Sequence, residues 1–274
     1  MDFVFNSNVL IFDVKLYLML ALFGVAVLAG FIDAIAGGGG LLTLPALFIA
    51  GIHPVAAIAT NKFQAASATV SATSAFAKKG MIDWKYVLPM MVMAALGSFV
   101  GALSISFLPK SVLEACVPIM LILVALYFAL SPKITNDKVK EKLSVFVFSL
   151  SIIPLLGFYD GVFGPGVGSF VMMAFVSLLG LGILNAMAHT KAINAASNIG
   201  ALAVFAWKGV IVWPIAIAMA LGAFVGAQLG TRCAVRVGVR LIKPMLVVMC
   251  CLMAIRLLLN EENPLRKFIG SWLW

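Results

Sequence analysis

The chain has 274 residues, of which 64% are hydrophobic and only 11% are charged. A soluble domain carries about 25% charged residues, so this composition excludes a large soluble enzyme and indicates a polytopic membrane protein. The net charge of +9 comes mostly from basic residues in short loops between apolar segments. That distribution is typical of membrane orientation rather than nucleic-acid binding. The four cysteines lack metal-ligand spacing, so we expect no metal and no other cofactor.

Ten apolar segments follow one another along the chain, and most approach the roughly 20 residues that a helix needs to span a bilayer. Segments 41–51 and 168–181 are shorter, and we expect them to be short or broken helices. The remaining segments lie at about 14–36, 54–77, 86–107, 112–131, 143–164, 183–206, 211–231 and 241–259. The sequence therefore predicts an all-α membrane protein with two halves of about five helical segments each.

The two halves carry an internal repeat. A shift of 127 residues aligns five identical residues, Gly30, Phe31, Asp33, Gly37 and Gly39 with Gly157, Phe158, Asp160, Gly164 and Gly166. A shift of 129 aligns eight more, Gly51, Lys62, Phe76, Lys79, Gly80, Trp84, Gly97 and Gly101 with Gly180, Lys191, Phe205, Lys208, Gly209, Trp213, Gly226 and Gly230. Shared hydrophobicity does not explain matched glycines, charges and tryptophans, so we interpret the pattern as a structural repeat of the transporter type.

These matches divide the chain into five parts. We expect an N-terminal segment (1–13), a first transmembrane repeat (14–131), a connecting loop (132–142), a second transmembrane repeat (143–259) and a C-terminal tail (260–274).

The basic loops switch position between the halves. The loop at 78–85 holds three lysines, and its equivalent holds only Lys208. The loop near residue 110 holds one lysine, and its equivalent holds Arg232, Arg236, Arg240 and Lys243. If basic loops share one side of the membrane, the halves are inverted repeats with five spans each. A parallel arrangement with four spans per half is the alternative, because it also places most basic residues on one side.

Each half contains a glycine cluster after its first long segment. The clusters comprise Gly37, Gly38, Gly39 and Gly40 in the first half, and Gly164, Gly166 and Gly168 in the second. Such sequences do not continue a helix well, and broken backbone at membrane depth requires a protein interior or a water-filled cavity. Each cluster precedes a short segment whose first N–H groups would attract an anion. A tight loop at the membrane surface is the alternative.

Two lysines lie inside apolar segments, where a charge costs roughly 2.5–3.5 kcal/mol. Lys62 and Lys191 occupy equivalent positions, and a lysine that faces an interior cavity would suit a small oxyanion. Asp33 and Asp160 are the natural counter-ions, because a paired buried charge cancels. An anion could then compete for the lysine while an aspartate takes a proton. Snorkelling of both lysines to the interface is the structural alternative.

Polar residues continue along the helical face that carries Lys191. Asn194 and Asn198 follow Lys191 at i+3 and i+7, on one helical face. They predict either a polar path for the substrate or hydrogen bonds between helices. His189 lies in the same segment, where a packed, hydrogen-bonded histidine and a proton relay are both open.

The motifs GFIDAIAGGGGLLTLPAL with ATNKFQA, and GFYDGVFGPGVGSF with HTKAINAASNIGAL, resemble the TauE/SafE sulfite-exporter family, and within it the YfcA type. The resemblance spans about residues 14–259. It implies a bacterial inner-membrane permease with duplicated halves that moves small sulfur-containing anions. The motif positions that carry over are Asp33, Gly37 to Gly40, Asn61, Lys62, Asp160, Gly164, Gly166, Lys191 and Asn194. Thr190 stands where the first half has Asn61, so we expect an asymmetric binding site.

The sequence therefore predicts a secondary transporter for a sulfite-like or organosulfonate anion, which could be coupled to protons and work by alternating access. An anion channel, and an intramembrane enzyme that uses Asp33 and Asp160, are the alternatives. The expected partners are the anionic substrate and the lipid bilayer. The GxxxG patterns at Gly97–Gly101 and Gly222–Gly230 predict close helix packing, within the chain or in a homodimer.

Overall fold

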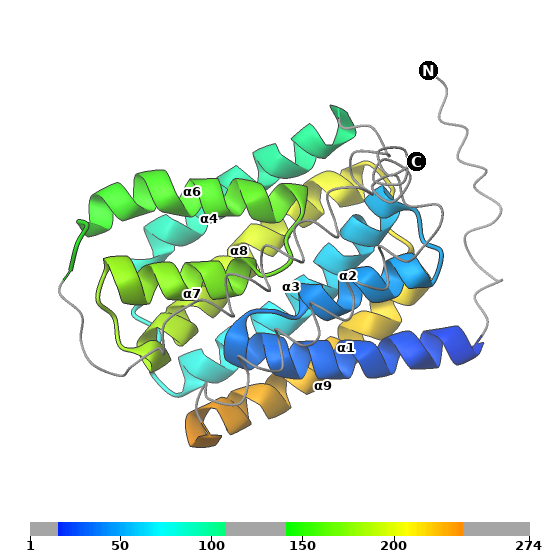
Figure 1. Cartoon of the computed structure of the whole chain (residues 1–274), viewed down its shortest axis with the longest axis horizontal. Coiled ribbons are helices and arrows are strands. Elements are labelled where there is room, and N and C mark those ends of the chain that lie inside the picture. Colours follow the sequence, from blue (N-terminus) through cyan, green and yellow to red (C-terminus); the bar gives the residue numbers. More distant parts are fainter. Residues whose placement is uncertain (1–15, 108–140, 238–274) are drawn as a thin grey trace, which may run out of the picture.

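The computed structural model describes residues 16–107 and 141–237, and these residues form a bundle of helices (Figure 1). The first half contains α1 (Leu16–Ala36), α2 (Gly40–Ile49), α3 (Pro54–Lys78), α4 (Trp84–Ser104) and the 3-10 helix η1 (Ile105–Phe107). The second half contains α6 (Val145–Val162), α7 (Val167–Leu178), α8 (Ile183–Trp207) and α9 (Trp213–Val237). The all-α prediction is confirmed for these ranges; the predicted segments 112–131 and 241–259 lie outside them.

The two short segments are helices of half the usual spanning length. α2 has 10 residues and α7 has 12. At 1.5 Å per residue, a 10-residue helix covers about 15 Å, which is roughly half of the hydrocarbon core. The prediction of short helices after the glycine clusters is therefore confirmed.

Local sequence signals set several helix starts. The carboxylate of Asp83 accepts hydrogen bonds from the backbone N–H groups of Lys85 and Tyr86, which caps α4. The hydroxyl of Ser144 accepts one from Val147 and caps α6. Pro54 opens α3, where its missing N–H would have no intrahelical partner.

Four described helices, α1, α4, α6 and α9, are long and apolar enough to cross a membrane. Their outer faces expose large apolar side chains such as Leu20, Leu96, Phe146 and Leu221. The helices α3 and α8, each of 25 residues, carry most of the buried polar residues and pass between these four (Figure 1). In that figure α1 and α9 lie on one side of the central pair, and α4 and α6 on the other. Lys62 on α3 and Lys191 on α8 are both 1% exposed, so their charges are kept away from lipid, where a charge is costly.

Glycines allow the outer helices to touch backbone to backbone. A Cβ atom at Gly226 would lie 2.0 Å from the carbonyl oxygen of Val27, and one at Gly230 would lie 2.3 Å from that of Phe31. Contacts at Gly97 and Gly101 join α4 to α6 in the same way. Within the described residues, both glycine patterns therefore serve packing inside the chain.

The contacts also fix the relative directions of the helices. Residue numbers rise together along α1 and α9, as from the Val27–Gly226 contact to the Phe31–Gly230 contact. α3 is parallel to α9, because Ser67 bonds to the carbonyl of Ala220 and Ser71 to that of Phe224. By equivalent contacts, α4 is parallel to α6 and α8. Short loops connect α3 to α4 and α8 to α9. The chain reverses direction at each loop, so the two helices of each pair are antiparallel.

One pair of hydrogen bonds repeats between the halves. Thr60 and His189 are 129 residues apart, as are Asp83 and Val212. The Thr60 hydroxyl accepts the backbone N–H of Val212 at 3.1 Å, and Nε2 of His189 accepts that of Asp83 at 3.2 Å. The two central helices are thus each attached to a loop of the other half.

Candidate functional site

The two glycine breaks meet inside the bundle. Gly37, with φ of 77°, ends α1, and a Cβ atom there would lie 2.4 Å from the carbonyl carbon of Gly168. Gly164 and Gly166 break the second half with φ of 94° and 82°. An L side chain would be strained at these positive φ values, and the Gly37 contact leaves no room for one. The glycines therefore bring the N-terminal ends of α2 and α7 together.

Several backbone donors at these helix starts already have partners. The N–H of Gly39 donates to the carboxylate of Asp33 at 3.2 Å, and that of Leu41 donates to the carbonyl of Gly38. In the second half, the N–H of Ser169 donates to the carbonyl of Gly166. An anion at this point would have to compete with these bonds.

Lys62 forms the first of two buried ion pairs. Its Nζ lies 2.6 Å from Oδ1 of Asp160, and the two side chains are 1% and 2% exposed. Nζ also lies 3.3 Å from Oδ1 of Asn198, and the hydroxyl of Ser197 donates to the other Asp160 oxygen at 2.5 Å. Both charges are therefore compensated without solvent, as a buried pair requires.

Lys191 forms the second pair, with Asp33. Its Nζ lies 3.0 Å from Oδ2 and also donates to the backbone carbonyl of Asp33. The Asp33 side chain is 14% exposed, against 2% for Asp160, while both lysines are 1% exposed. The second pair is therefore the more open of the two.

The pairs cross between the halves. Lys62 belongs to the first half and binds the second-half aspartate, and Lys191 binds the first-half aspartate. The sequence predicted lysine–aspartate pairing but left the partners open. Crossed pairing makes each ion pair a contact between halves, so any relative movement of the halves at this point must change it.

A small cavity of about 20 Å³ lies beside the first pair. This volume holds about one water molecule. Its lining comes from both halves and comprises Asp33, Gly37, Gly40, Asn61, Lys62, Ala65, Thr69, Asp160, Gly164, Gly166, Val167, Asn194 and Asn198. The structure therefore brings most of the sequence-predicted site residues together around one small polar cavity.

The three asparagines at this cavity have different partners. Asn61 accepts a 2.5 Å hydrogen bond from the hydroxyl of Thr43, which ties α3 to α2. Asn198 donates to the backbone carbonyl of Asn194. Oδ1 of Asn194 is buried and has no hydrogen-bond partner within the described residues. A buried amide group without its full set of partners is costly, so this side chain is a candidate to contact a bound molecule.

Other predicted residues lie outside the cavity lining. Gly38, Gly39 and Gly168 belong to the helix breaks, and Lys191 reaches the cavity only through Asp33. Thr190 is buried, and its hydroxyl is unpaired within the described part of the chain. In the described ranges no cluster of three or more His, Cys, Asp or Glu side chains is placed to hold a metal ion.

His189 is packed and hydrogen-bonded. Its Nδ1 lies 2.6 Å from the carbonyl of Asn185 and its Nε2 accepts the N–H of Asp83. Tyr86 and Phe175 pack against the ring. Both ring nitrogens therefore have hydrogen-bond partners, as a packed histidine requires.

Two further residues support the site, although the sequence had not assigned them to it. Ser197 holds Asp160, and Thr43 holds Asn61. Ser197 follows Asn194 and adjoins Asn198 in α8, and this run of polar residues after Lys191 was the available signal. Thr43 gave no comparable signal, because a single threonine in a short apolar helix is common.

Comparison with known proteins identifies the family. The model of the sulfite exporter TauE/SafE family matches residues 22–257. The chain belongs to this family. The resemblance seen in the two glycine–lysine motifs is thereby confirmed, and the chain is a member of a membrane transporter family.

Curated relatives cover almost the whole chain. A probable membrane transporter protein, ORF9, of Sinorhizobium is 47% identical over 94% of this chain and 99% of its own. The probable membrane transporter protein YfcA of Escherichia coli K12 is 42% identical over 98% of both chains. A probable membrane transporter protein of Haemophilus influenzae is 38% identical over 91% of this chain and 98% of its own. No solved structure matches the chain.

Proposed function

We propose that the protein is a multi-pass secondary transporter of the bacterial inner membrane that moves a small sulfur-containing anion, such as sulfite or an organosulfonate, by alternating access. The observation that carries this proposal is the pair of crossed lysine–aspartate contacts between the halves. Two buried lysines in the interior of the bundle are costly in a membrane and serve no anchoring purpose.

The chemistry of the two lysines favours an oxyanion. Each ammonium has three donors and a positive charge, and each is held by a carboxylate that an anion can replace. Asn194 and Asn198 would orient the anion, since both side chains reach the cavity. The sulfur-containing class follows from the family's description, sulfite exporter, and is part of the proposal.

The helix directions support inverted repeats. α1, α3 and α9 run one way, and α4, α6 and α8 run the other. The equivalent pairs are α1 with α6, α3 with α8 and α4 with α9, so each pair contains both directions. Inverted repeats with discontinuous helices at the centre are a common architecture of alternating-access carriers.

The cavity volume limits what can bind without movement of the helices. A space of about 20 Å³ holds about one water molecule, so it is too small for a sulfur oxyanion. For an anion to enter, the crossed pairs must separate. We propose that the halves rock about this point and that Asp33, the more exposed carboxylate, takes up a proton when Lys191 binds substrate.

The paired-carboxylate enzyme has less support. Asp33 and Asp160 both line the cavity, yet each is bonded to a lysine rather than to the other carboxylate. A carboxylate pair of the aspartic-protease type would instead share a proton between its members. The crossed pairing therefore supports binding rather than catalysis.

Flux measurements in proteoliposomes test this function. We expect saturable uptake of radiolabelled sulfite or a sulfonate by the wild type, and loss of uptake in Lys62→Ala and Lys191→Ala. Lys142→Ala is the matched control, because Lys142 is exposed and lies before α6. Undiminished uptake in both site variants would exclude the assigned site, and uptake of none of these anions would exclude the substrate class.

A further inference from the structure

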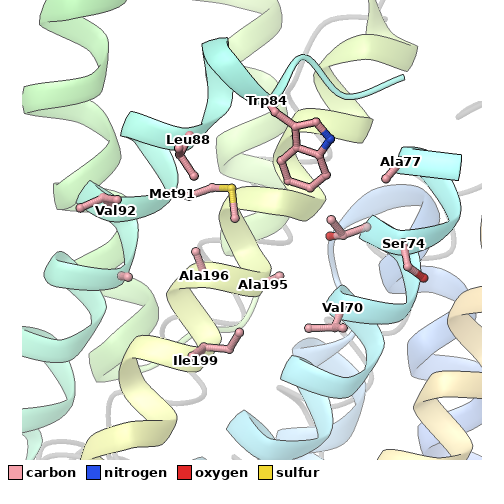
Figure 2. Close-up of a pocket in the computed structure, with 12 residues that line it drawn as sticks. Val70, Ser74, Ala77, Trp84, Leu88, Met91, Val92, Ala195, Ala196 and Ile199 are labelled. Atoms are coloured by element: carbon pink, nitrogen blue, oxygen red, sulfur yellow. The ribbon is translucent and has the colours of Figure 1, made fainter. Parts of the chain in front are cut away.

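A second, larger cavity lies on the outside of the bundle, away from the crossed ion pairs. It is an open groove of about 630 Å³ between α3, α4 and α8. Figure 2 shows Trp84 near one end, and Val70 and Ile199 near the other, with Leu88 and Met91 along the side. Nearly all the lining side chains are apolar, so the groove suits a hydrocarbon chain rather than a polar solute.

The groove faces the lipid side of the described helices. Trp84, Leu88 and Ile199 are all exposed. Trp84 adjoins the 79–83 loop and Ala77 lies one residue before the end of α3, so one end of the groove opens at the loop. From there the groove runs along α3 and α4 toward the middle of the membrane. Its shape matches an acyl chain that hangs from a headgroup at the loop.

Three lysines surround that open end. Lys78, Lys79 and Lys85 are exposed and flank Trp84 and the loop. Asp83 lies among them and caps α4 with its carboxylate. These four side chains together carry a net charge of +2, which is the complement of an anionic headgroup. Basic clusters directly beside a membrane span bind anionic lipids.

The equivalent position in the other half lacks this cluster. Trp213 corresponds to Trp84, and both tryptophans are 47% exposed. The loop before Trp213 spans 208–212 and carries only Lys208. The positive-inside rule places the lysine-rich loop at the cytoplasmic leaflet, where anionic phospholipids meet it.

We propose that this groove is a binding site for an anionic phospholipid. One acyl chain lies between α3, α4 and α8, and the phosphate contacts Lys78, Lys79 and Lys85 beside the Trp84 ring. This site is independent of the transported solute, because it lies on the outer face of α3 and α8. Lipid bound there would bridge the α3–α4 hairpin of one half and α8 of the other.

Fluorescence quenching by brominated lipids tests the site. Trp84 is kept as the single tryptophan, with Trp207, Trp213, Trp272 and Trp274 replaced by phenylalanine. The protein is reconstituted in phosphatidylcholine vesicles with rising fractions of dibrominated phosphatidylglycerol or dibrominated phosphatidylcholine. We expect half-maximal quenching of Trp84 at an at least about fivefold lower fraction of the anionic lipid. The triple variant K78Q/K79Q/K85Q should remove this preference.

The Trp213-only protein is the matched control, because its tryptophan is equally exposed. We expect both lipids to quench it alike. Equal quenching of Trp84 by both lipids would overturn the proposal. So would an anionic preference of the same size at Trp213, or the absence of quenching by either lipid at Trp84, which would show that protein covers the groove. Transport activity is not part of this readout, so its loss would not affect the result.

Discussion

Lys62 and Asp160 are 98 residues apart in the sequence, and their side chains meet at 2.6 Å in the interior of the bundle. The contact joins the first half to the second, and Lys191 and Asp33 make the reciprocal one. Each half thus supplies the cation for one pair and the carboxylate for the other. Stability and transport should both depend on these pairs, but in different ways.

Removal of one charge should be worse for stability than removal of both. Lys62→Gln leaves the Asp160 carboxylate buried without its cation, which we expect to cost about 3–5 kcal/mol. The double variant K62Q/D160N leaves no buried charge at this pair and should recover a large part of that loss. Thermal unfolding of the purified variants in detergent measures both effects. A double variant that is less stable than either single variant would contradict this account.

The two aspartates should respond unequally to neutralisation. Asp160→Asn leaves Lys62 uncompensated in a site that is 2% exposed, whereas Asp33 is 14% exposed. We expect Asp33→Asn to lower the melting temperature less than Asp160→Asn does.

If Asp33 carries the coupled proton, D33N should also abolish the dependence of flux on an imposed pH gradient. A pH-gradient response equal to that of the wild type would remove Asp33 from this role.

His189 should be needed for structure rather than for proton transfer. In His189→Leu, the part-buried N–H of Asp83 loses its acceptor, which we expect to cost about 1 kcal/mol. His189→Thr is the informative variant, because Thr60 performs the same task in the other half. It should be more stable than H189L, and its flux should respond to a pH gradient as the wild type does. Loss of the pH response in a folded H189T protein would favour a proton relay.

The glycine contact between α1 and α9 predicts a steric effect. A methyl group at position 226 would collide with the Val27 carbonyl at 2.0 Å, so Gly226→Ala should destabilise the protein by about 1–3 kcal/mol. Gly24→Ala on α1 is the matched control, since a methyl group there would meet no atom of another described helix within 4 Å. There the better helix propensity of alanine should give up to about 1 kcal/mol of added stability. Equal melting temperatures for the two variants would argue against close packing at this contact.

The sequence predicted the helix breaks and the lysine–aspartate chemistry because both depend on local residue types. The glycines around Gly37 and Gly164 indicate a break because several of them lie close together, and a buried lysine needs a counter-ion in any fold. The choice of partner depends on how the halves pack, so the crossed pairing of Lys62 with Asp160 could not be predicted. Thr190 shows the same limit: repeat position placed it with Asn61, but it does not line the cavity.

The central claim is that Lys62 and its counter-ion form part of the binding site for a small oxyanion. Counterflow of radiolabelled sulfite or sulfonate into preloaded proteoliposomes tests this claim most directly, with K62Q/D160N beside the wild type and K142A. The double variant removes the cation without leaving a buried charge, so its folding can be verified by the melting curve. We predict saturable counterflow for the wild type and K142A, and none for a folded K62Q/D160N protein. Counterflow by that double variant at the wild-type rate would contradict the account.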